Sequence, residues 1–332
     1  MTATPILELD HLSVDFRLGT GRVRALSDVS LAIGPGEVLG LVGESGCGKS
    51  LTSLAIMRLL PRNAAIAGGR IRLGDHELTA ISEAEMRALR GNAVSMIFQE
   101  PAVALNPLVT IGRQIEESLL IHRSMSRYAR MRRALELLTL VGMPDPRERH
   151  RQYPHELSGG MGQRAMIAMA LACEPGLIIA DEPTTALDAT IQAQILDLLR
   201  DIRDRLGTAI LFITHNMGVI ADIADRVAVM YAGQIVETAP VERLFASPAH
   251  PYTAGLLRSI PDLGSDRRER LPSIAGRVPP LGAIPPACPF QDRCAFVTAV
   301  CREDRPILAA VAPGHHAACW HPLTAATSLE VG

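Results

Sequence analysis

A glycine-rich stretch, GESGCGKS, joins an apolar run at 37–42, predicted to be a strand, to an expected helix at 49–60. It fits the pattern G-x-x-x-x-G-K-[ST] in the context where that pattern carries meaning. Glycines let the backbone curl so that its N–H groups face phosphate oxygens, and the start of the helix adds positive potential. We therefore predict a nucleoside triphosphate site, formed by Gly43, Glu44, Ser45, Gly46, Cys47, Gly48, Lys49, Ser50 and Leu51.

Lysine usage supports this interpretation. Lys49 is the only lysine among 33 basic residues, so arginine stands at the other 32 positions. A genome that favours arginine codons explains those positions, but a site that needs a compact ammonium must keep lysine. We expect Lys49 to reach the β- and γ-phosphates and the hydroxyl of Ser50 to bind Mg²⁺.

The stretch LIIADEP covers residues 177–183, and its first part, 177–181, is a short apolar run that ends in acid, as a buried parallel strand should. Asp181 at the strand end is predicted to hold Mg²⁺ beside Ser50. Glu182 is placed to act as general base toward the attacking water. Paired acids can also merely cap a following helix, but the phosphate loop makes the catalytic role the better interpretation.

A second anion-binding helix start occurs at LSGGMGQR, residues 157–164. Ser158, Gly159 and Gly160 precede an expected helix at 161–173, so free backbone N–H groups would again face an anion. One chain does not need two such cradles for one triphosphate. The second is therefore predicted to serve the nucleotide of a partner.

Taken together, these motifs resemble the ABC transporter ATPase family, whose signature is similar to LSGGQ, over residues 7–261. In that family the phosphate loop of one subunit and the signature of another enclose each ATP. Met161 replaces the signature glutamine, and the sequence assigns no role to Gly162. The resemblance implies that Gln99 senses Mg²⁺ and water, that His215 contacts the γ-phosphate and that adenine stacks on Phe16. It also implies that the Ala186–Leu187–Asp188 loop crosses the dimer interface and that Gln163 binds the partner's nucleotide.

Two further stretches, FQEPAVALNP at 98–107 and HPYTAGLLRSIP at 250–261, look like the subgroup that imports dipeptides and oligopeptides. Nickel importers of the same subgroup share both stretches. The sequence therefore predicts peptide import and leaves nickel import open as the alternative.

Four of the six cysteines follow a proline-rich stretch, in the spacing C-x5-C-x6-C-x17-C. In a cytoplasmic protein, clustered thiols favour metal over disulfides. The spacing resembles that with which some peptide-importer ATPases hold a [4Fe–4S] cluster. Structural zinc, with nearby histidines as further ligands, and unligated thiols remain alternatives. The expected cluster ligands are Cys288, Cys294, Cys301 and Cys319.

The expected fold class is α/β, with a P-loop NTPase core on a mostly parallel sheet, an antiparallel β-subdomain, a helical subdomain and a small Cys-rich module. The predicted boundaries are 5–261 for the ATPase domain, with helices at about 101–170, then 262–322 for the extension and 323–332 for a tail. The net charge of −2 argues against a nucleic-acid partner. No signal peptide or apolar run long enough to span a membrane is evident.

The leading hypothesis is a peripheral ATPase on the cytoplasmic face of the inner membrane. The resemblance implies a second ABC ATPase in a heterodimer, two permeases and an extracytoplasmic peptide-binding protein. A soluble ABC ATPase acting on nucleic acid would generally carry a coiled-coil insertion or a second cassette, and neither is seen. A redox sensor would need an electron partner that the sequence does not supply. An exporter is disfavoured because many carry fused membrane spans.

Overall fold

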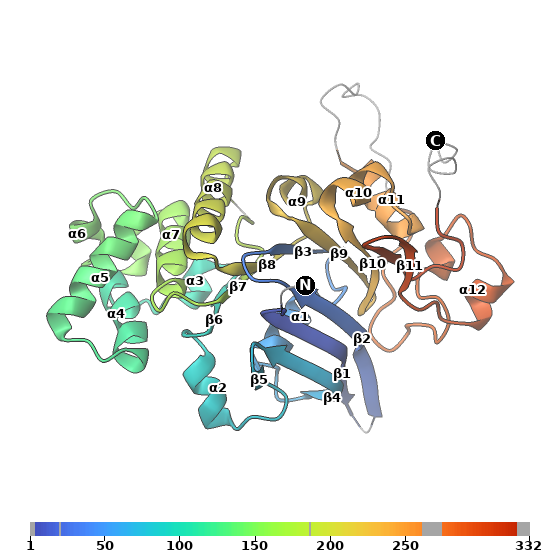
Figure 1. Ribbon diagram of the computed structural model, residues 1–332, viewed down its shortest axis with the longest axis horizontal. Coiled ribbons are helices and arrows are strands. Elements are labelled where there is room, and N and C mark those ends of the chain that lie inside the picture. The colour runs from blue at the N-terminus through green and yellow to red at the C-terminus, as the bar shows by residue number, and fades with distance from the viewer. Residues whose placement is uncertain (1–3, 20, 186, 261–273, 324–332) are drawn as a thin grey trace. The chain divides into compact units, whose positions relative to one another are not determined.

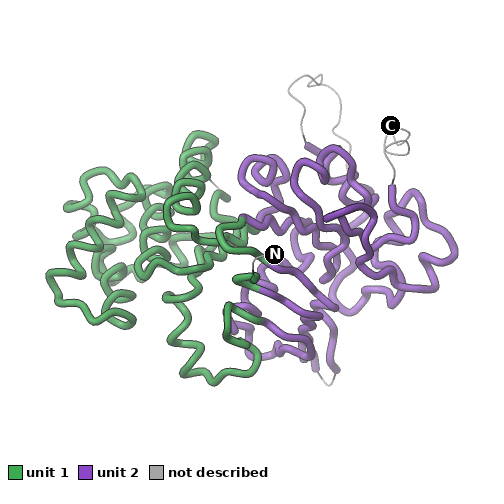
Figure 2. The backbone as a smooth tube through the Cα atoms, in the orientation of Figure 1, with its two compact units in different colours: residues 1–7, 33–37, 72–213 green, residues 8–32, 38–71, 214–332 purple. Residues whose placement is uncertain are grey.

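The computed structural model describes residues 4–19, 21–185, 187–260 and 274–323, which divide between two compact units (Figure 2). Unit 1 comprises residues 1–7, 33–37 and 72–213, and unit 2 comprises residues 8–32, 38–71 and 214–332. Ala186, residues 261–273 of the expected linker and residues 324–332 of the expected tail lie outside the described residues.

Unit 1 is built on a parallel sheet in which β7 (Leu177–Asp181) lies between β6 (Val94–Ile97) and β8 (Ala209–Thr214, whose last residue belongs to unit 2). Every residue of β7 and β8 is buried, because a parallel sheet is covered on both faces and selects continuous apolar runs. The carboxyl ends of these strands lead into the acidic and glutamine-bearing loops of the predicted site.

Helices follow the strands of unit 1, and several of them lie together to the left of β6 and β7 in Figure 1. The longest, α8, begins at the cap Asp188 and ends at Gly207, whose φ of 66° is the left-handed value expected of a helix-ending glycine. Its apolar residues Ile195, Leu198, Leu199 and Ile202 recur at helical spacing and are buried. The helices are α2 (Glu83–Leu89), α3 (Pro101–Ala104), α4 (Ile111–His122), α5 (Arg127–Leu140), α6 (Pro146–Arg149), α7 (Gly159–Ala170) and α8 (Ala189–Leu206), with a 3₁₀ turn at Pro154–Glu156.

Unit 2 contains a mixed sheet. Strand β3 (Val38–Val42) runs parallel to β9 (Arg226–Tyr231), which forms an antiparallel hairpin with β10 (Gln234–Pro240). Two short antiparallel strands, β12 (His315–Ala317) and β11 (Ala309–Ala312), extend this sheet beyond β10. The C-terminal segment is thus paired by backbone hydrogen bonds to the unit that carries the phosphate loop.

A separate sheet has β1 (Leu7–Leu18) between β2 (Gly21–Ile33) and β4 (Ala64–Leu73), and β4 pairs antiparallel with β5 (His76–Glu77). The helices of unit 2 are α1 (Lys49–Ile56), α9 (Met217–Ile223), α10 (Val241–Ala246), α11 (Pro251–Arg258) and α12 (Ala299–Glu303), with a 3₁₀ turn at Gln291–Arg293. None of the helices in the described part of the chain is long and apolar enough to cross a membrane.

Candidate nucleotide site

The phosphate loop connects β3 to α1 in unit 2. At two of its positions the backbone conformation and the close neighbours require glycine. At Gly43, φ is 154°, and a Cβ atom would overlap the carbonyl oxygen of Met230 and the sulfur of Cys47. At Gly48, φ is 114°, and a Cβ atom would lie 2.7 Å from the side chain of Leu26. Neighbouring residues thus lie so close to the loop backbone that a side chain would not fit at these two positions, which explains why the motif has glycine there.

Lys49 opens α1 and is only 5% exposed. Its Nζ donates to the carbonyl of Gly43 at 2.7 Å and to that of Glu44 at 3.1 Å. The N-cap of α1 is Gly48, which has no side chain to bond the N–H groups of the first turn. Ser50 is exposed at this helix start, as a Mg²⁺ ligand would be. Together these groups form a concentrated set of donors suited to an anion.

Sequence reasoning missed two residues that contact Glu44. The carboxylate of Glu44 forms an ion pair with Arg293 through Nη1–Oε2 at 2.6 Å and Nη2–Oε1 at 3.0 Å. The N–H of Glu44 donates to the hydroxyl of Tyr252 at 2.8 Å. The HPY motif marked Tyr252 only as a subgroup feature, and no signal in one sequence links Arg293 to a loop 249 positions away.

The acidic end of β7 lies in unit 1. Asp181 is 7% exposed, and the next residue, Glu182, has φ of 49° in the left-handed region, where a residue with a Cβ is uncommon. Glu182 Oε2 accepts hydrogen bonds from Nε2 of Gln99 at 3.1 Å and from Oγ1 of Thr185 at 2.9 Å. The structure therefore brings together the glutamine and the glutamate that were expected to handle the attacking water.

The signature, also in unit 1, begins α7. Ser158 is the N-cap, and its hydroxyl accepts from the N–H of Met161 at 3.4 Å. The helix starts at Gly159, two residues earlier than expected, because this serine caps it. A Cβ atom at Gly159 would meet no atom of the described residues within 4 Å, whereas one at Gly160 would lie 3.0 Å from Ile191.

Two other signature residues face the interior of unit 1. A Cβ atom at Gly162 would lie 3.2 Å from that of Pro101, so the absence of a side chain lets α3 pack closely on α7. Gln163 is 2% exposed, and its amide nitrogen makes no hydrogen bond within the described residues. The geometry thus gives Gly162 a packing role that the sequence did not reveal.

The remaining expected residues occupy loops and strand ends. Asp188 caps α8 by accepting from the N–H groups of Thr190 and Ile191 at 3.0 and 2.9 Å. His215 is exposed directly after β8. Phe16 on β1 is half-buried and lines a pocket that also contains the side chains of Arg17, Arg22 and Arg62.

The four C-terminal cysteines line one cavity in unit 2, together with His250, Phe290 and other residues. Burial raises the pKa of each of the thiols of Cys288, Cys294 and Cys319, that of Cys319 to about 12. The sulfur of Cys294 accepts from the N–H of Phe296 at 3.4 Å. Among the described residues, no three His, Cys, Asp or Glu side chains are arranged so as to hold a metal ion.

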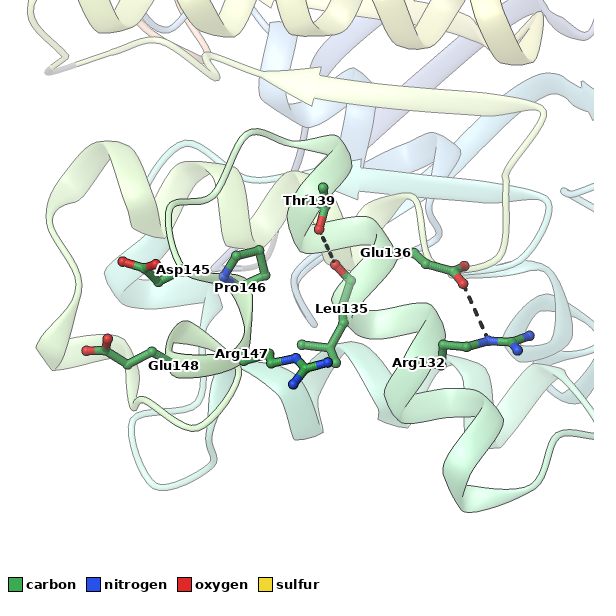
Figure 3. A pocket seen from close by; sticks show the side chains of 8 residues that line it. All are labelled: Arg132, Leu135, Glu136, Thr139, Asp145, Pro146, Arg147 and Glu148. Atoms are coloured by element: carbon green, nitrogen blue, oxygen red, sulfur yellow. Dashed lines mark hydrogen bonds and ion pairs between the residues drawn. The ribbon is translucent and has the colours of Figure 1, made fainter.

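A larger pocket lies between α5 and α6 in unit 1 and contains none of the predicted site residues (Figure 3). Its walls carry charges of both signs, and Arg132 pairs with Glu136 at 3.5 Å along α5. The hydroxyl of Thr139 donates to its own helix, at the carbonyl of Leu135. A solvated ion pair of this kind is an ordinary feature of a helix surface.

Comparison with known proteins decides the family. Residues 26–185 match a family model described as ABC transporter, and residues 236–301 match one described as oligopeptide/dipeptide transporter, C-terminal region. A Sinorhizobium fredii protein, named as the peptide ABC transporter ATP-binding protein y4tR, is 53% identical over 316 residues, covering 95% of this chain and 94% of its own. The chain belongs to the peptide-import family of ABC transporter ATP-binding proteins. It is therefore an ABC transporter ATPase.

Other relatives agree with this assignment. A Brucella melitensis protein named as a peptide import ATP-binding protein is 51% identical over 338 residues, covering 98% of this ABC ATPase and all of its own chain. Among solved structures, the ATP-binding cassette MJ0796, described as a dimer bound to ADP and Pi, aligns with a TM-score of 0.64 and 28% identity. That alignment covers 71% of this chain and 98% of the cassette. The expected α/β fold with an antiparallel β-subdomain is thereby confirmed, and the large sheet is mixed, because β10, β11 and β12 pair antiparallel in it.

Proposed function

We propose that this ABC ATPase hydrolyses ATP to drive the import of dipeptides or oligopeptides through partner permeases. The observation that carries the proposal is the C-terminal region, residues 236–301, which matches the model shared by oligopeptide and dipeptide transporters. The names of two relatives, one referring to a peptide ABC transporter and the other to peptide import, point to the same cargo.

At the phosphate loop, Lys49 binds the β- and γ-phosphates, while the loop N–H groups and the α1 start hold the remaining oxygens. Ser50 and Asp181, with Gln99, hold Mg²⁺, which neutralises charge on the phosphates when bound. The adenine stacks on Phe16. The hydrogen-bond donors around Lys49 support this assignment. Lys49 is buried, and the next residue, Ser50, is exposed.

Glu182 accepts a proton from water as the water oxygen bonds to the γ-phosphorus and the bond to the ADP oxygen breaks. Gln99 and Thr185 orient the carboxylate, because both donate to the same oxygen. His215 contacts the γ-phosphate from the loop after β8.

Each ATP lies between two subunits in this proposal. Ser158, Gly159, Gly160 and Gln163 of one chain serve the nucleotide on the partner's phosphate loop, and the Asp188 loop contacts the partner. The open space beside Gly159 supports this arrangement, because none of the described residues occupies it. The partner is a second ABC ATPase, and the pair works on two permeases at the cytoplasmic face of the membrane, fed by an extracytoplasmic peptide-binding protein.

The C-terminal extension, residues 262–322, is proposed to follow an ATPase domain of residues 5–261 with its helices at about 101–170. Its four cysteines supply the number and type of ligands that a [4Fe–4S] cluster needs, and they line one cavity, although the described residues do not hold three of them in a metal-binding arrangement. Cys288, Cys294, Cys301 and Cys319 would be the ligands, and the cluster would tie the segment together. Zinc is the alternative occupant.

Transport is tested by reconstituting the complete complex, with both permeases, the second ATPase and the binding protein, in proteoliposomes. ATP-dependent uptake of labelled dipeptides or oligopeptides is the expected result, and it should vanish when Lys49→Ala replaces the wild-type chain. Uptake of nickel without peptide would assign the nickel alternative. ATP hydrolysis with neither uptake would contradict both cargoes.

The metal is tested on anaerobically purified full-length chain. About four irons per chain and a brown colour are expected for a cubane cluster, and Cys294→Ser should remove both. One stoichiometric zinc in colourless protein would assign the site to zinc. Chain without either metal, prepared with iron and zinc supplied during expression, would contradict the metal proposal.

A further inference from the structure

The contact between the C-terminal segment and the phosphate loop joins parts of unit 2 that are distant in sequence. Glu44, the second residue of the loop, is held at three points. Its carboxylate pairs with Arg293, its N–H donates to Tyr252, and its carbonyl accepts from Lys49. Two of these three partners come from the C-terminal part of the chain, so this part fixes the start of the loop.

Arg293 is itself held rigidly. Its side chain is 4% exposed, and its Nε donates to the carbonyl of Ala275 at 2.8 Å. The guanidinium lies over the rings of Tyr231 and Phe290, 5.7 and 5.9 Å from their centroids. A bidentate, stacked arginine of this kind is pre-organised, since its planar fork needs little further ordering to hold a carboxylate.

Tyr252 is fixed with equal firmness. It is fully buried, and its ring centroid is 4.7 Å from that of Tyr231. Its own N–H donates to Nδ1 of His250, and the N–H of His250 donates to the buried carboxylate of Glu237. The tyrosine hydroxyl that meets Glu44 is therefore anchored through α11 to strand β10.

The charge of Glu44 gives this contact a function. The loop exists to bind a triphosphate, and a free carboxylate within it would repel that anion. Arg293 neutralises the carboxylate from the side, at hydrogen-bonding distance, and draws it into a fixed pair. Repulsion between two negative charges is strong in a partly buried site, because solvent screens it weakly there.

We infer that Arg293 and Tyr252 are positioning residues of the ATP site, and that Arg293 balances the charge of Glu44 so that the phosphate loop can accept a triphosphate. The C-terminal segment is in this view part of the nucleotide site. The inference rests on the proposed role of the phosphate loop in binding ATP.

The test measures the affinity of the full-length chain for ATP and ADP at two salt concentrations. Arg293→Met should raise the Kd for ATP about tenfold, because an unbalanced negative charge then lies within the phosphate loop. The rise should be smaller for ADP, which carries less charge, and smaller at high salt. Arg293→Lys keeps the positive charge but loses the planar, two-pronged guanidinium. Its Kd for ATP should lie between those of Arg293→Met and the wild type.

Removing the carboxylate distinguishes charge balance from general loosening. The double variant Glu44→Gln with Arg293→Met should recover most of the lost affinity, because no unpaired charge remains. Arg305→Met is the matched control, since Arg305 also holds this segment, through the carbonyls of Pro285 and Pro286 and the hydroxyl of Ser27 on β2, without touching the loop. It should lower stability while leaving the Kd unchanged.

Two results would overturn the inference. One is an unchanged Kd in Arg293→Met while the wild type binds ATP. The other is an equal loss in Arg293→Met and Arg305→Met that Glu44→Gln does not reverse. A wild-type chain that binds no ATP would instead count against the proposed function of the loop, so the two failures are distinguishable. Tyr252→Phe should weaken ATP binding without changing the preference for ATP over ADP, because it removes a hydrogen bond and no charge.

Discussion

The side-chain amide of Gln99 and the carboxylate of Glu182 are joined by a hydrogen bond of 3.1 Å, from the end of β6 to the end of β7. Thr185 donates to the same carboxylate oxygen at 2.9 Å. Glu182 also has a left-handed backbone, with its N–H donated to the carbonyl of Ile213 at 2.9 Å. Its carboxylate is thus fixed by both backbone and side-chain contacts before any nucleotide arrives.

Glu182→Gln tests the proposed general base. The glutamine keeps the shape of the side chain but cannot accept the proton from water. We expect ATP hydrolysis in the assembled transporter to fall at least about a hundredfold, while ATP binding stays within about twofold. Thr185→Val is the control, because it removes one hydrogen bond to the carboxylate and leaves the base in place. Its turnover should fall far less, and near-normal turnover in Glu182→Gln would remove Glu182 from this role.

Gly159→Glu separates a role within the chain from a role toward a partner. Gly159 is the first residue of α7 and has open space beside it, so a glutamate there should leave the free energy of unfolding unchanged or raise it by up to about 1 kcal/mol. Facing the partner's triphosphate, however, the same carboxylate should lower ATP hydrolysis by the assembled complex at least about tenfold. Chemical denaturation and ATPase assays measure the two effects.

Gly68 provides the control, because it is exposed and a Cβ atom added to it would also meet no described atom within 4 Å. Gly68→Glu should leave hydrolysis at the wild-type rate. If Gly159→Glu hydrolyses ATP as fast as Gly68→Glu in the complete transporter, the signature does not face a partner's nucleotide.

Stability should depend on pH through His250. This residue is buried, and burial lowers its pKa from 6.5 to about 4 despite the nearby carboxylate of Glu237. The unfolded chain therefore binds a proton between these values while the folded chain does not. This difference contributes fully to the free energy of unfolding above pH 6.5. As the pH falls toward 4, the free energy of unfolding decreases by roughly 3 kcal/mol in total.

In the wild type, Nδ1 of His250 accepts a hydrogen bond from the N–H of Tyr252. His250→Asn removes the titrating group, and the asparagine still offers an oxygen that can accept this hydrogen bond. Urea unfolding of both chains between pH 7 and pH 4 should show a shallower pH dependence for the variant, even if the variant is less stable at pH 7. Parallel curves for the two chains would show that His250 does not lose its proton on folding.

Local pattern was enough to predict several elements of the fold. Strand β7 was predicted with its observed bounds, because continuous apolar runs of this length are buried in parallel sheets. The glycine-rich loop was predicted to open a helix at Lys49, and α1 begins at that residue. These features depend on neighbours in sequence, so a single sequence contains them.

Contacts between distant positions could not be predicted in this way. Glu44 was expected only as a member of the phosphate loop, yet Tyr252 and Arg293, 208 and 249 positions away, hold it. Gly162 had no assigned role until Pro101 was found to pack against it. Glycine and arginine are common residues, and their spacing says nothing about which distant group they meet.

Lys49 is the only lysine, so it carries the only side-chain primary amine in the chain. Its nitrogen is buried and hydrogen-bonded to two carbonyls of the phosphate loop. Acylating reagents, which modify amines and spare guanidinium groups, can therefore reach this side chain only when the loop opens. The rate of such labelling would follow local opening of the loop at a single position, much as hydrogen exchange does for backbone amides.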